Sequence, residues 1–512
     1  MTLTVYDIPI SASFFITSEQ SDLRQSINNF RIYFDLKAMA INKAKTFAKN
    51  KAKGLANEKA PGFMRFLSNF KTFEVGKCRP NYSDLTLKGI SVSGVNIEFT
   101  PGKFYAAFST GKVKRPIKPS GIIKPTYKQK LLFGKIGVGK KRETHIYLTF
   151  MHIEDEVKSL PVSSEIDTLN IKPQSNFVLG TEGKLSLFKK KFTIEGEAAV
   201  SLNTRDTRSP ELIEDDNEVP SWLTGFLKPN ASSSIDYAYN VKSTLNLKTT
   251  KLSGGVKMIG AGFTTLGNPN LINDRLTYDG RIDQTFAKKK ISFSVYFRQN
   301  KDNLINWKKS TTTTTAYGIT AGFRFKKVPY LQFSYTPNFQ KNDSDSLKMK
   351  NSVHVFSLST GYNYKIGNLR TMTSFNFFYQ NTEIVIDTMT SGSKNQTYTL
   401  NETISFKIPL SLSGGISYNK SEFSGQKRDI LSLTLSGTHS AFKKKWKNTL
   451  GVRYSNRIDE QQKVRIFYSS RMKLWNGGDL DIRIEENIFR DNIQVVNNYD
   501  EFIVRAALLI KW

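Results

Sequence analysis

The C-terminal stretch EFIVRAALLIKW, residues Glu501 to Trp512, decides the fold. Every second position of this stretch is apolar, and the set comprises Phe502, Val504, Ala506, Leu508, Ile510 and Trp512. The alternate positions include the basic residues Arg505 and Lys511. A period of two with one wholly apolar side predicts a β-strand whose one side never meets water. Chain ends usually fray, so a terminal Trp on that side is expected to be held by its surroundings.

Alternation of the same kind recurs through most of the chain. Leu331 and Phe333, for example, interleave with Gln332 and Ser334. Such strands are longer than the five or six residues usual in globular sheets. With 36 Phe, 21 Tyr and almost no long helical periodicity, the sequence predicts an all-β fold. Strands are predicted almost without pause from residue 85 onward, among them 85–99, 251–264, 330–341 and 500–512.

Short and longer connections alternate between these strands. The short ones are rich in Lys, as at 188–191, 287–290 and 443–445. The longer ones are polar and are predicted at 205–232, 265–274, 301–313, 342–350, 382–395 and 491–499. This asymmetry is typical of transmembrane β-barrels, which have short turns at one rim and longer loops at the other.

The last strand resembles the C-terminal strand of Gram-negative outer-membrane β-barrel proteins, which typically ends on an aromatic with apolar residues alternating upstream. Trp512 stands where Phe is commoner, and the strand has no central glycine. The resemblance implies a single large transmembrane antiparallel β-barrel in the cell outer membrane. It implies outer-membrane lipid, the barrel-assembly machinery and other envelope proteins as partners. The residues expected to close the barrel are Phe502, Val504, Leu508, Ile510 and Trp512.

Counting strands gives a barrel of about 22–26, because even numbers are expected. Residues 83–512 are predicted to form the barrel, and residues 1–82 an N-terminal hairpin with one short basic helical insertion at about 38–57. That insertion is rich in Ala and Lys. An amphipathic basic helix of this kind either lies on anionic headgroups or plugs the lumen, and a solvated insertion is the alternative.

The N-terminal residues Met1 to Asp7 contain neither a basic segment nor an apolar core, so no secretory signal is visible. An outer-membrane location therefore requires that the signal was removed or truncated. No apolar run is long enough for a transmembrane helix. The single cysteine, Cys78, excludes an intramolecular disulfide.

The net charge of +31 comes from 75 Lys and Arg against 44 Asp and Glu. Nucleic acid is the usual partner of so basic a chain. Here much of the Lys lies at the strand turns, where it can reach lipid phosphates. We therefore expect contact with lipid headgroups and no nucleic-acid partner.

Motifs for catalysis or cofactor binding are weak. Gly134 to Lys141 has the spacing of a phosphate loop, but Lys141 replaces the Ser or Thr that would hold magnesium, and a strand follows. The four histidines are too scattered for a zinc site, and neither His145 nor His152 has a recognisable nucleophile or carboxylate set near it. We expect no enzyme activity, no cofactor and no metal.

One acidic segment, residues 211–218, is either a solvated loop or a loop that calcium could fold. Trp222 and Phe226 nearby indicate that the loop packs against other residues, with the lumen as one place for this contact. The solvated loop is the preferred interpretation.

Charged residues concentrate on one side of the last strands. They are Arg453, Lys463, Arg465, Arg471, Lys473, Asp479, Asp481, Arg483, Glu485 and Arg505. Lys473 and Asp479 flank the Asn476-Gly477 turn and are expected to face each other across it. This lumen wall is either a ladder of salt bridges that stiffens the sheet or a net basic surface that favours anionic solutes.

Two functions follow from this interpretation. The first is a porin-like channel or transporter for polar or anionic solutes. The alternative is a non-conducting barrel subunit of an outer-membrane secretion or assembly complex, with a filled lumen and an outer surface that binds partners.

Overall fold

The computed structural model describes residues 2–5, 8–15, 29–34, 66–67, 69–117, 125–160, 171–211, 229–443, 445–458, 460–475 and 478–510. Among these residues, no helix combines the length and the apolar character needed to span a bilayer. The predicted helical insertion at 38–57, most of the acidic segment 211–218, Trp222, Phe226 and Trp512 lie outside the described residues.

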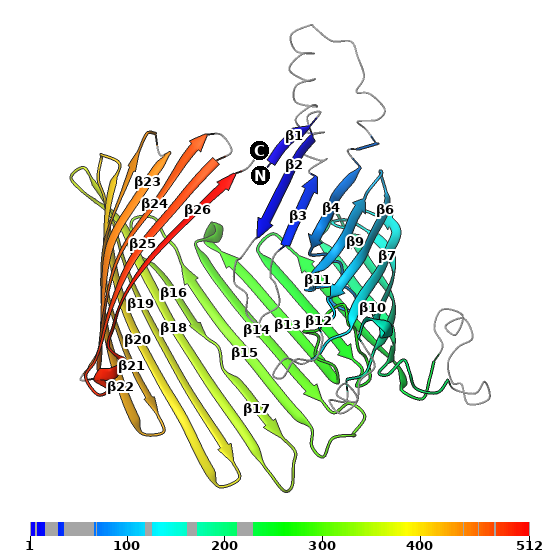
Figure 1. Ribbon diagram of the computed structural model, residues 1–512. Helices are drawn as coiled ribbons and strands as arrows, with labels where there is room; N and C mark the ends of the chain where they lie inside the picture. Colours follow the sequence, from blue (N-terminus) through cyan, green and yellow to red (C-terminus); the bar gives the residue numbers. More distant parts are fainter. Residues whose placement is uncertain are drawn as a thin grey trace. The chain divides into compact units, whose positions relative to one another are not determined.

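Nearly all regular structure among the described residues is β-strand, and strands that follow one another in the chain pair antiparallel (Figure 1). The exception is β16 and β17, which each pair with β15 and with β18. The structure assigns 26 strands to one sheet within the described residues, which is inside the predicted range. The chain divides into two compact units. Unit 1 contains residues 1–244 and 255–276, and unit 2 contains residues 245–254 and 277–511.

The described residues of unit 1 contain the first strands of the chain and one short 3-10 helix. The boundary with unit 2 runs through β11, β12 and β13. The bounds are β1 Thr2–Val5, β2 Ile8–Phe15, β3 Asn29–Phe34, β4 Phe70–Cys78, β5 Val92–Phe99, β6 Phe104–Lys114, β7 Lys128–Gly139, β8 His145–Glu156, η1 Val157–Ser159, β9 Ser175–Leu187, β10 Phe192–Thr204, β11 Ser233–Asn246 and β12 Thr250–Ile259.

Unit 2 contains most of β13 and all the strands that follow it. Their bounds are β13 Arg275–Phe286, η3 Ala287–Lys289, β14 Ile291–Asp302, β15 Thr312–Phe323, β16 Tyr330–Tyr335, β17 Asn338–Asn342, β18 Met349–Ile366, β19 Leu369–Ile386, β20 Met389–Ser405, β21 Leu410–Phe423, β22 Gln426–Ala441, β23 Trp446–Arg457, β24 Gln461–Trp475, β25 Gly478–Asp491, η4 Val495–Asn497 and β26 Tyr499–Ile510.

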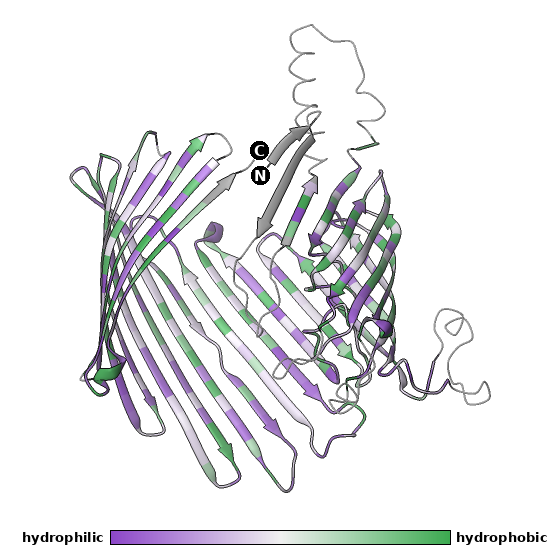
Figure 2. Cartoon of the chain, in the orientation of Figure 1, coloured by the Kyte–Doolittle hydropathy of each residue, from purple (hydrophilic) through white to green (hydrophobic). Residues whose placement is uncertain are grey.

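Burial in unit 1 is reversed relative to a water-soluble sheet. Hydrophobic and hydrophilic residues alternate along the strands (Figure 2). On β7 and β8 the exposed side is apolar, with Ile136 and Ile146 both 56% exposed and Leu148 59% exposed. The opposite side is buried and mixed, and it includes Lys135 at 2% and Thr149 at 5%. The exposed side is called the apolar face of the sheet, and the other side the polar face.

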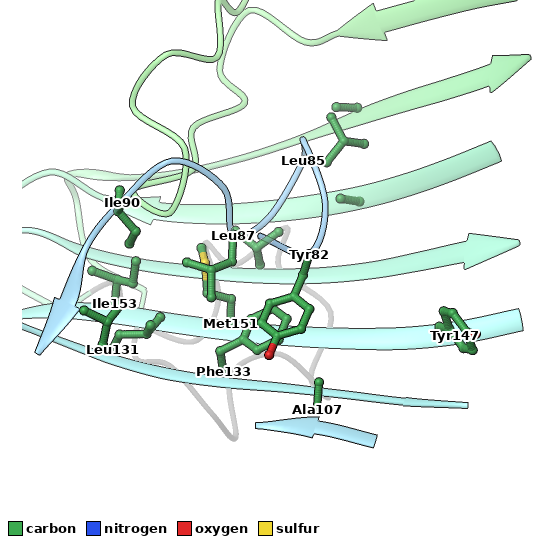
Figure 3. Packing of buried hydrophobic residues seen from close by; sticks show 14 of the residues in the cluster. Tyr82, Leu85, Leu87, Ile90, Ala107, Leu131, Phe133, Tyr147, Met151 and Ile153 are labelled. Carbon is green, nitrogen blue, oxygen red and sulfur yellow. The ribbon is translucent and has the colours of Figure 1, made fainter. Parts of the chain in front are cut away.

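Two loops cover the polar face of unit 1 at one end. Residues 79–91 place Tyr82, Leu85 and Leu87 in one buried hydrophobic cluster with Phe133 and Met151, in which Tyr82 stacks on Phe133 and Leu87 lies beside Met151 (Figure 3). Residues 260–274 add Phe263 to the same cluster. The predicted strands 85–99 and 251–264 are therefore wrong at one end each, because β5 begins at residue 92 and β12 ends at residue 259. The alternating leucines fill a core instead of extending a strand.

The two loops are hydrogen-bonded to each other. The amide of Lys88 donates to the carbonyl of Gly267 at 2.9 Å, and the Thr265 hydroxyl donates to the carbonyl of Thr86 at 2.8 Å. A Cβ added at Gly267 would lie 2.4 Å from the Thr86 carbonyl oxygen, so only glycine permits this approach. The loops therefore form one packed layer on the polar face.

Unit 2 corrects two further predictions. The loop predicted at 382–395 is strand, because β19 continues to residue 386 and β20 begins at residue 389. Its Thr, Ser and Asn residues resemble a loop in composition but pair in register across the hairpin. The single strand predicted at 330–341 is divided into β16 and β17. Pro337 lies at the break, where it cannot donate to the strand ladder.

The C-terminal strand is present as predicted over its described length. β26 pairs antiparallel with β25 from Phe489 opposite Tyr499 to Gly478 opposite Ile510. On its apolar side Phe502 is 69% exposed and Val504 is 57% exposed. For Leu508 and Ile510 the structure gives the backbone register alone.

Candidate functional site

The predicted charged residues of the last strands lie on one face of unit 2. The register places Lys447, Arg471 and Asp481 in one row across β23, β24 and β25. Arg483 and Arg505 lie opposite each other in the next row, on β25 and β26. Residues in such rows point to the same side of a sheet. The same face of β21 and β22 carries hydroxyl groups, since Ser413 and Ser432 each contact a hydroxyl across the strand at 3.1 Å.

Part of the charge on this face is neutralised by ion pairs. Arg471 donates twice to the Asp481 carboxylate, from Nε at 2.6 Å and from Nη2 at 2.8 Å. Arg483 forms an ion pair with Glu485 on its own strand. Lys473 lies opposite Asp479 in register, as predicted from the turn between them. A bidentate pair such as that of Arg471 with Asp481 is the strongest form of charge-assisted hydrogen bond.

Other cations on this face lie opposite cations. Lys447 is the register partner of Arg471, and Arg453 is the partner of Arg465. Arg465 donates to the amide oxygen of Asn487 at 2.9 Å, and Lys463 lies 5.9 Å from the centre of the Tyr499 ring. Like charges directly opposite each other destabilise a strand pair. The face therefore has more positive charge than its own carboxylates can neutralise.

A groove of about 510 Å³ opens on this part of the face. The charged residues that line it are Lys447, Arg471, Asp481, Arg483 and Arg505. Four of these are basic and one is acidic. The side chains of Thr449, Ser469 and Ala507 complete the lining on this face, whereas those of Ser470, Ile482 and Ala506 alternate to the other face. We call this site the basic groove.

A second polar site lies on the buried face of unit 1. Lys135 on β7 is 2.5 Å from Glu182 on β9, and Nε2 of His145 on β8 is 3.3 Å from the other oxygen of that carboxylate. The Lys135 side chain is 2% exposed and that of His145 is 3% exposed. Strand pairing therefore brings a carboxylate to His145, which was not expected from the sequence.

Aromatic rings connect this ion pair to a second one. Tyr147 stacks on His145 and on Tyr105, with ring centres 4.3 and 4.4 Å apart. The Tyr105 hydroxyl donates to Glu98 at 2.8 Å, and Lys71 lies 2.6 Å from the same carboxylate. We call these residues, Lys71, Glu98, Tyr105, Lys135, His145, Tyr147 and Glu182, the buried polar cluster. Each of its charged groups has a partner, which suits a rigid network.

Glycine provides the space for this stack. A Cβ added at Gly137 would lie 2.7 Å from Cδ1 of Tyr147, too close for any other residue. Gly137 is the register partner of Tyr147 and belongs to the segment that has phosphate-loop spacing. Residues 134–139 are part of β7, so the segment is a strand and not a loop that opens a helix.

Sequence reasoning missed the buried polar cluster. The available signal was the occurrence of Glu98, Lys135 and Glu182 within otherwise strand-like segments. The register of the six strands that the cluster joins, β4 to β9, cannot be read from the sequence of any one strand. The charged residues of β24 and β25 could be placed opposite each other from the sequence, because the short turn between these two strands sets their register.

The part of the chain that the structure describes contains no group of three or more His, Cys, Asp or Glu residues suited to a metal ion. The acidic segment considered for calcium binding lies outside the described residues, apart from Glu211, which forms an isolated β-bridge with Asn230.

No protein-family model and no curated protein matches this sequence. Solved structures that match it include outer-membrane proteins and a transporter. The FrpB iron transporter from Neisseria meningitidis is 11% identical, with 82% of this chain and 78% of that chain covered and a TM-score of 0.41. The outer membrane protein opdK from Pseudomonas aeruginosa is 7% identical, with 66% and 93% covered and a TM-score of 0.33.

A bacterial polysaccharide outer membrane secretin also matches, at 8% identity and a TM-score of 0.27, with 70% of this chain and 98% of that chain covered. At this level of similarity the matches support no statement about what this protein binds or transports.

Proposed function

We propose that the protein is an integral outer-membrane β-barrel that conducts polar solutes. The observation that carries the membrane location is the reversed burial of its strands. Large apolar side chains are exposed on one side, such as Leu148 in unit 1 and Leu435 and Leu450 in unit 2, at 59%, 65% and 59%. An apolar band facing outward is what hydrocarbon requires and water penalises.

Backbone hydrogen bonding supports closure of the sheet into a barrel. A sheet edge exposed to hydrocarbon leaves amide and carbonyl groups without partners, and each such group costs several kcal/mol. Only a closed sheet avoids this cost, because it has no edge. We therefore infer that the long antiparallel sheet forms a barrel whose polar face lines a lumen.

The polar face of unit 2 supports conduction, with a preference for anions. It carries hydroxyl side chains, the basic groove and cations that lie opposite cations. A net basic wall of this kind favours anionic solutes over cationic ones. The salt-bridge ladder accounts for Arg471 and Arg483 but leaves the charge of Lys447 and Arg505 on this face.

A second candidate function is a non-conducting barrel in a secretion or assembly complex. It is favoured by one observation, the layer of residues 79–91 and 260–274 that covers part of the polar face of unit 1. In this case outer-membrane lipid, the barrel-assembly machinery and other envelope proteins are the expected partners.

Planar-bilayer recording of the purified protein separates the two functions. We expect discrete conductance steps and, across a KCl gradient, a reversal potential of the sign that anion selectivity produces. A protein that inserts into lipid but remains electrically silent, and that co-purifies with envelope proteins, would support the second candidate. Heat-modifiable migration on a gel checks the membrane barrel itself, and a monomer that folds in water without lipid or detergent would refute it.

A further inference from the structure

The basic groove contains two cations that lack an acidic partner. Among the described residues, neither Lys447 nor Arg505 forms an ion pair, whereas Arg471 and Arg483 each do. Arg505 lies directly opposite Arg483, and Lys447 directly opposite Arg471. Each unpaired cation therefore faces a second cation across one strand pair. The carboxylates of Asp481 and Glu485 offset the second cation of each couple, so one positive charge per couple stays uncompensated, which is unfavourable for an empty sheet.

A bound anion removes this unfavourable arrangement. An acidic group placed between Arg483 and Arg505 would accept charge-assisted hydrogen bonds from both guanidinium groups. A second acidic group could accept hydrogen bonds from the Lys447 ammonium and from Nη1 of Arg471, the guanidinium nitrogen that does not bond to Asp481. Both couples line one depression, the basic groove.

The spacing of the two couples limits the ligand. One couple joins β23 to β24 and the other joins β25 to β26, so their midpoints are two strand spacings apart, or roughly 10 Å across the sheet, and one row apart along the strands. Inorganic phosphate is too small to contact both couples. A volume of about 510 Å³ suits a small organic molecule. Between the charged ends lie Ser469 and the Asp481 carboxylate, whose charge Arg471 neutralises, and the small Ala507 beside them leaves room for a short ligand body.

We propose that the basic groove is a binding site for an elongated organic dianion, with one acidic group between Arg483 and Arg505 and the other between Lys447 and Arg471. This site extends the proposed function and rests on it, since the polar face must be open to water. Selective conduction requires only a basic wall, whereas this site predicts saturable binding that depends on ligand length.

The test is isothermal titration of the detergent-folded full chain with dicarboxylates of increasing length, succinate, adipate and suberate. Octanoate is the monoanionic control, and inorganic phosphate the small-anion control. We expect saturable binding of the longer dicarboxylates, with affinity about tenfold or more above that of octanoate. The affinity should fall as salt is added, because the groove is exposed to water.

Charge reversal distinguishes a binding site from a structural feature. Arg505→Glu places a carboxylate opposite Arg483, so the variant should fold with equal or higher thermal stability. It should nevertheless lose dicarboxylate binding by about tenfold or more. Arg298→Gln is the matched control, because Arg298 is an exposed cation on the corresponding face of β14 and does not line the groove.

Equal affinity for octanoate and suberate, or dicarboxylate binding that Arg505→Glu leaves unchanged, would overturn the proposed site. These outcomes are separate from failure of the proposed function. Conductance without saturable binding refutes the site alone, and saturable binding by a protein that does not conduct refutes conduction alone.

Discussion

Lys135 on β7 forms an ion pair with Glu182 on β9, and β8 lies between the two strands. The lysine Nζ lies 2.5 Å from the carboxylate and 5.3 Å from the centre of the Tyr147 ring on β8. Three strands are thus joined through side chains on the buried face. A lysine with 2% exposure has lost almost all its hydration, so the carboxylate and the ring must replace it.

Lys135→Met is expected to destabilise the protein by about 3 kcal/mol, because it leaves the Glu182 carboxylate without its nearest cation. Unfolding in detergent micelles, followed by circular dichroism against urea, measures the change. The double variant Lys135→Met with Glu182→Leu should recover most of the loss, since an apolar pair requires no desolvated charge. A double variant as unstable as the single one would show that the site fails through packing and not through the unpaired charge.

Leu148→Arg is expected to destabilise the protein in lipid bilayers by about 2–4 kcal/mol, because the side chain faces hydrocarbon. Leu450→Arg tests the same expectation in unit 2. Both leucine side chains are 59% exposed. If they faced water instead of hydrocarbon, replacement by Arg would change the stability little. Equilibrium unfolding in liposomes measures the effect, with Ser346→Arg in an exposed loop as the control. Leucine variants as stable as this control would contradict the lipid-facing assignment.

Much of the fold was predictable because strand periodicity is a local property. The strands from β18 to β26 follow from the alternation of residues such as Leu433 and Leu435, which needs no knowledge of distant contacts. Two of the errors, at residues 85–91 and 260–264, occurred where tertiary packing overrides the pattern. Leu85 and Leu87 alternate like strand residues, yet they belong to a loop that fills a core. Nothing local distinguishes the two cases.

The candidate sites differ in the same way. The wall that contains Arg471 and Asp481 could be placed from the sequence, because the turn after β24 fixes the register of the hairpin. The opposition of Arg483 and Arg505 could not, because a loop of several residues joins β25 and β26 and leaves the register open. The buried polar cluster likewise depends on the register of six successive strands, β4 to β9.

Asp84→Asn is expected to make the protein less sensitive to acid. Burial raises the pKa of the Asp84 carboxyl. The hydrogen bond from Lys88 and the charges of Lys257 and Lys88 together lower this pKa by more than burial raises it, so the net pKa is below its usual value. The two ammonium groups lie 2.5 and 3.5 Å away. A depressed pKa contributes stability above the unfolded value of about 3.9, and this is lost as the pH falls through the folded value.

The melting temperature in detergent at pH 7 and at about pH 3 measures this contribution. The drop between the two should be smaller for Asp84→Asn than for the wild type. Asp345→Asn is the control, because Asp345 is an exposed loop residue and forms no ion pair among the described residues. A variant that loses as much stability in acid as the wild type would show that other carboxylates govern the transition.

Deletion of residues 502–512 is expected to abolish membrane assembly. β26 pairs with β25 over its full length, from residues 489 and 499 to residues 478 and 510. Without it, β25 would present a row of unpaired amide and carbonyl groups as an edge, which hydrocarbon does not tolerate. Heat-modifiable migration after refolding in lipid measures assembly, and deletion of Ser344 to Ser346 in the exposed β17–β18 loop should leave it intact. Folded protein recovered from the C-terminal deletion would mean that the last strand is dispensable and that the sheet closes elsewhere.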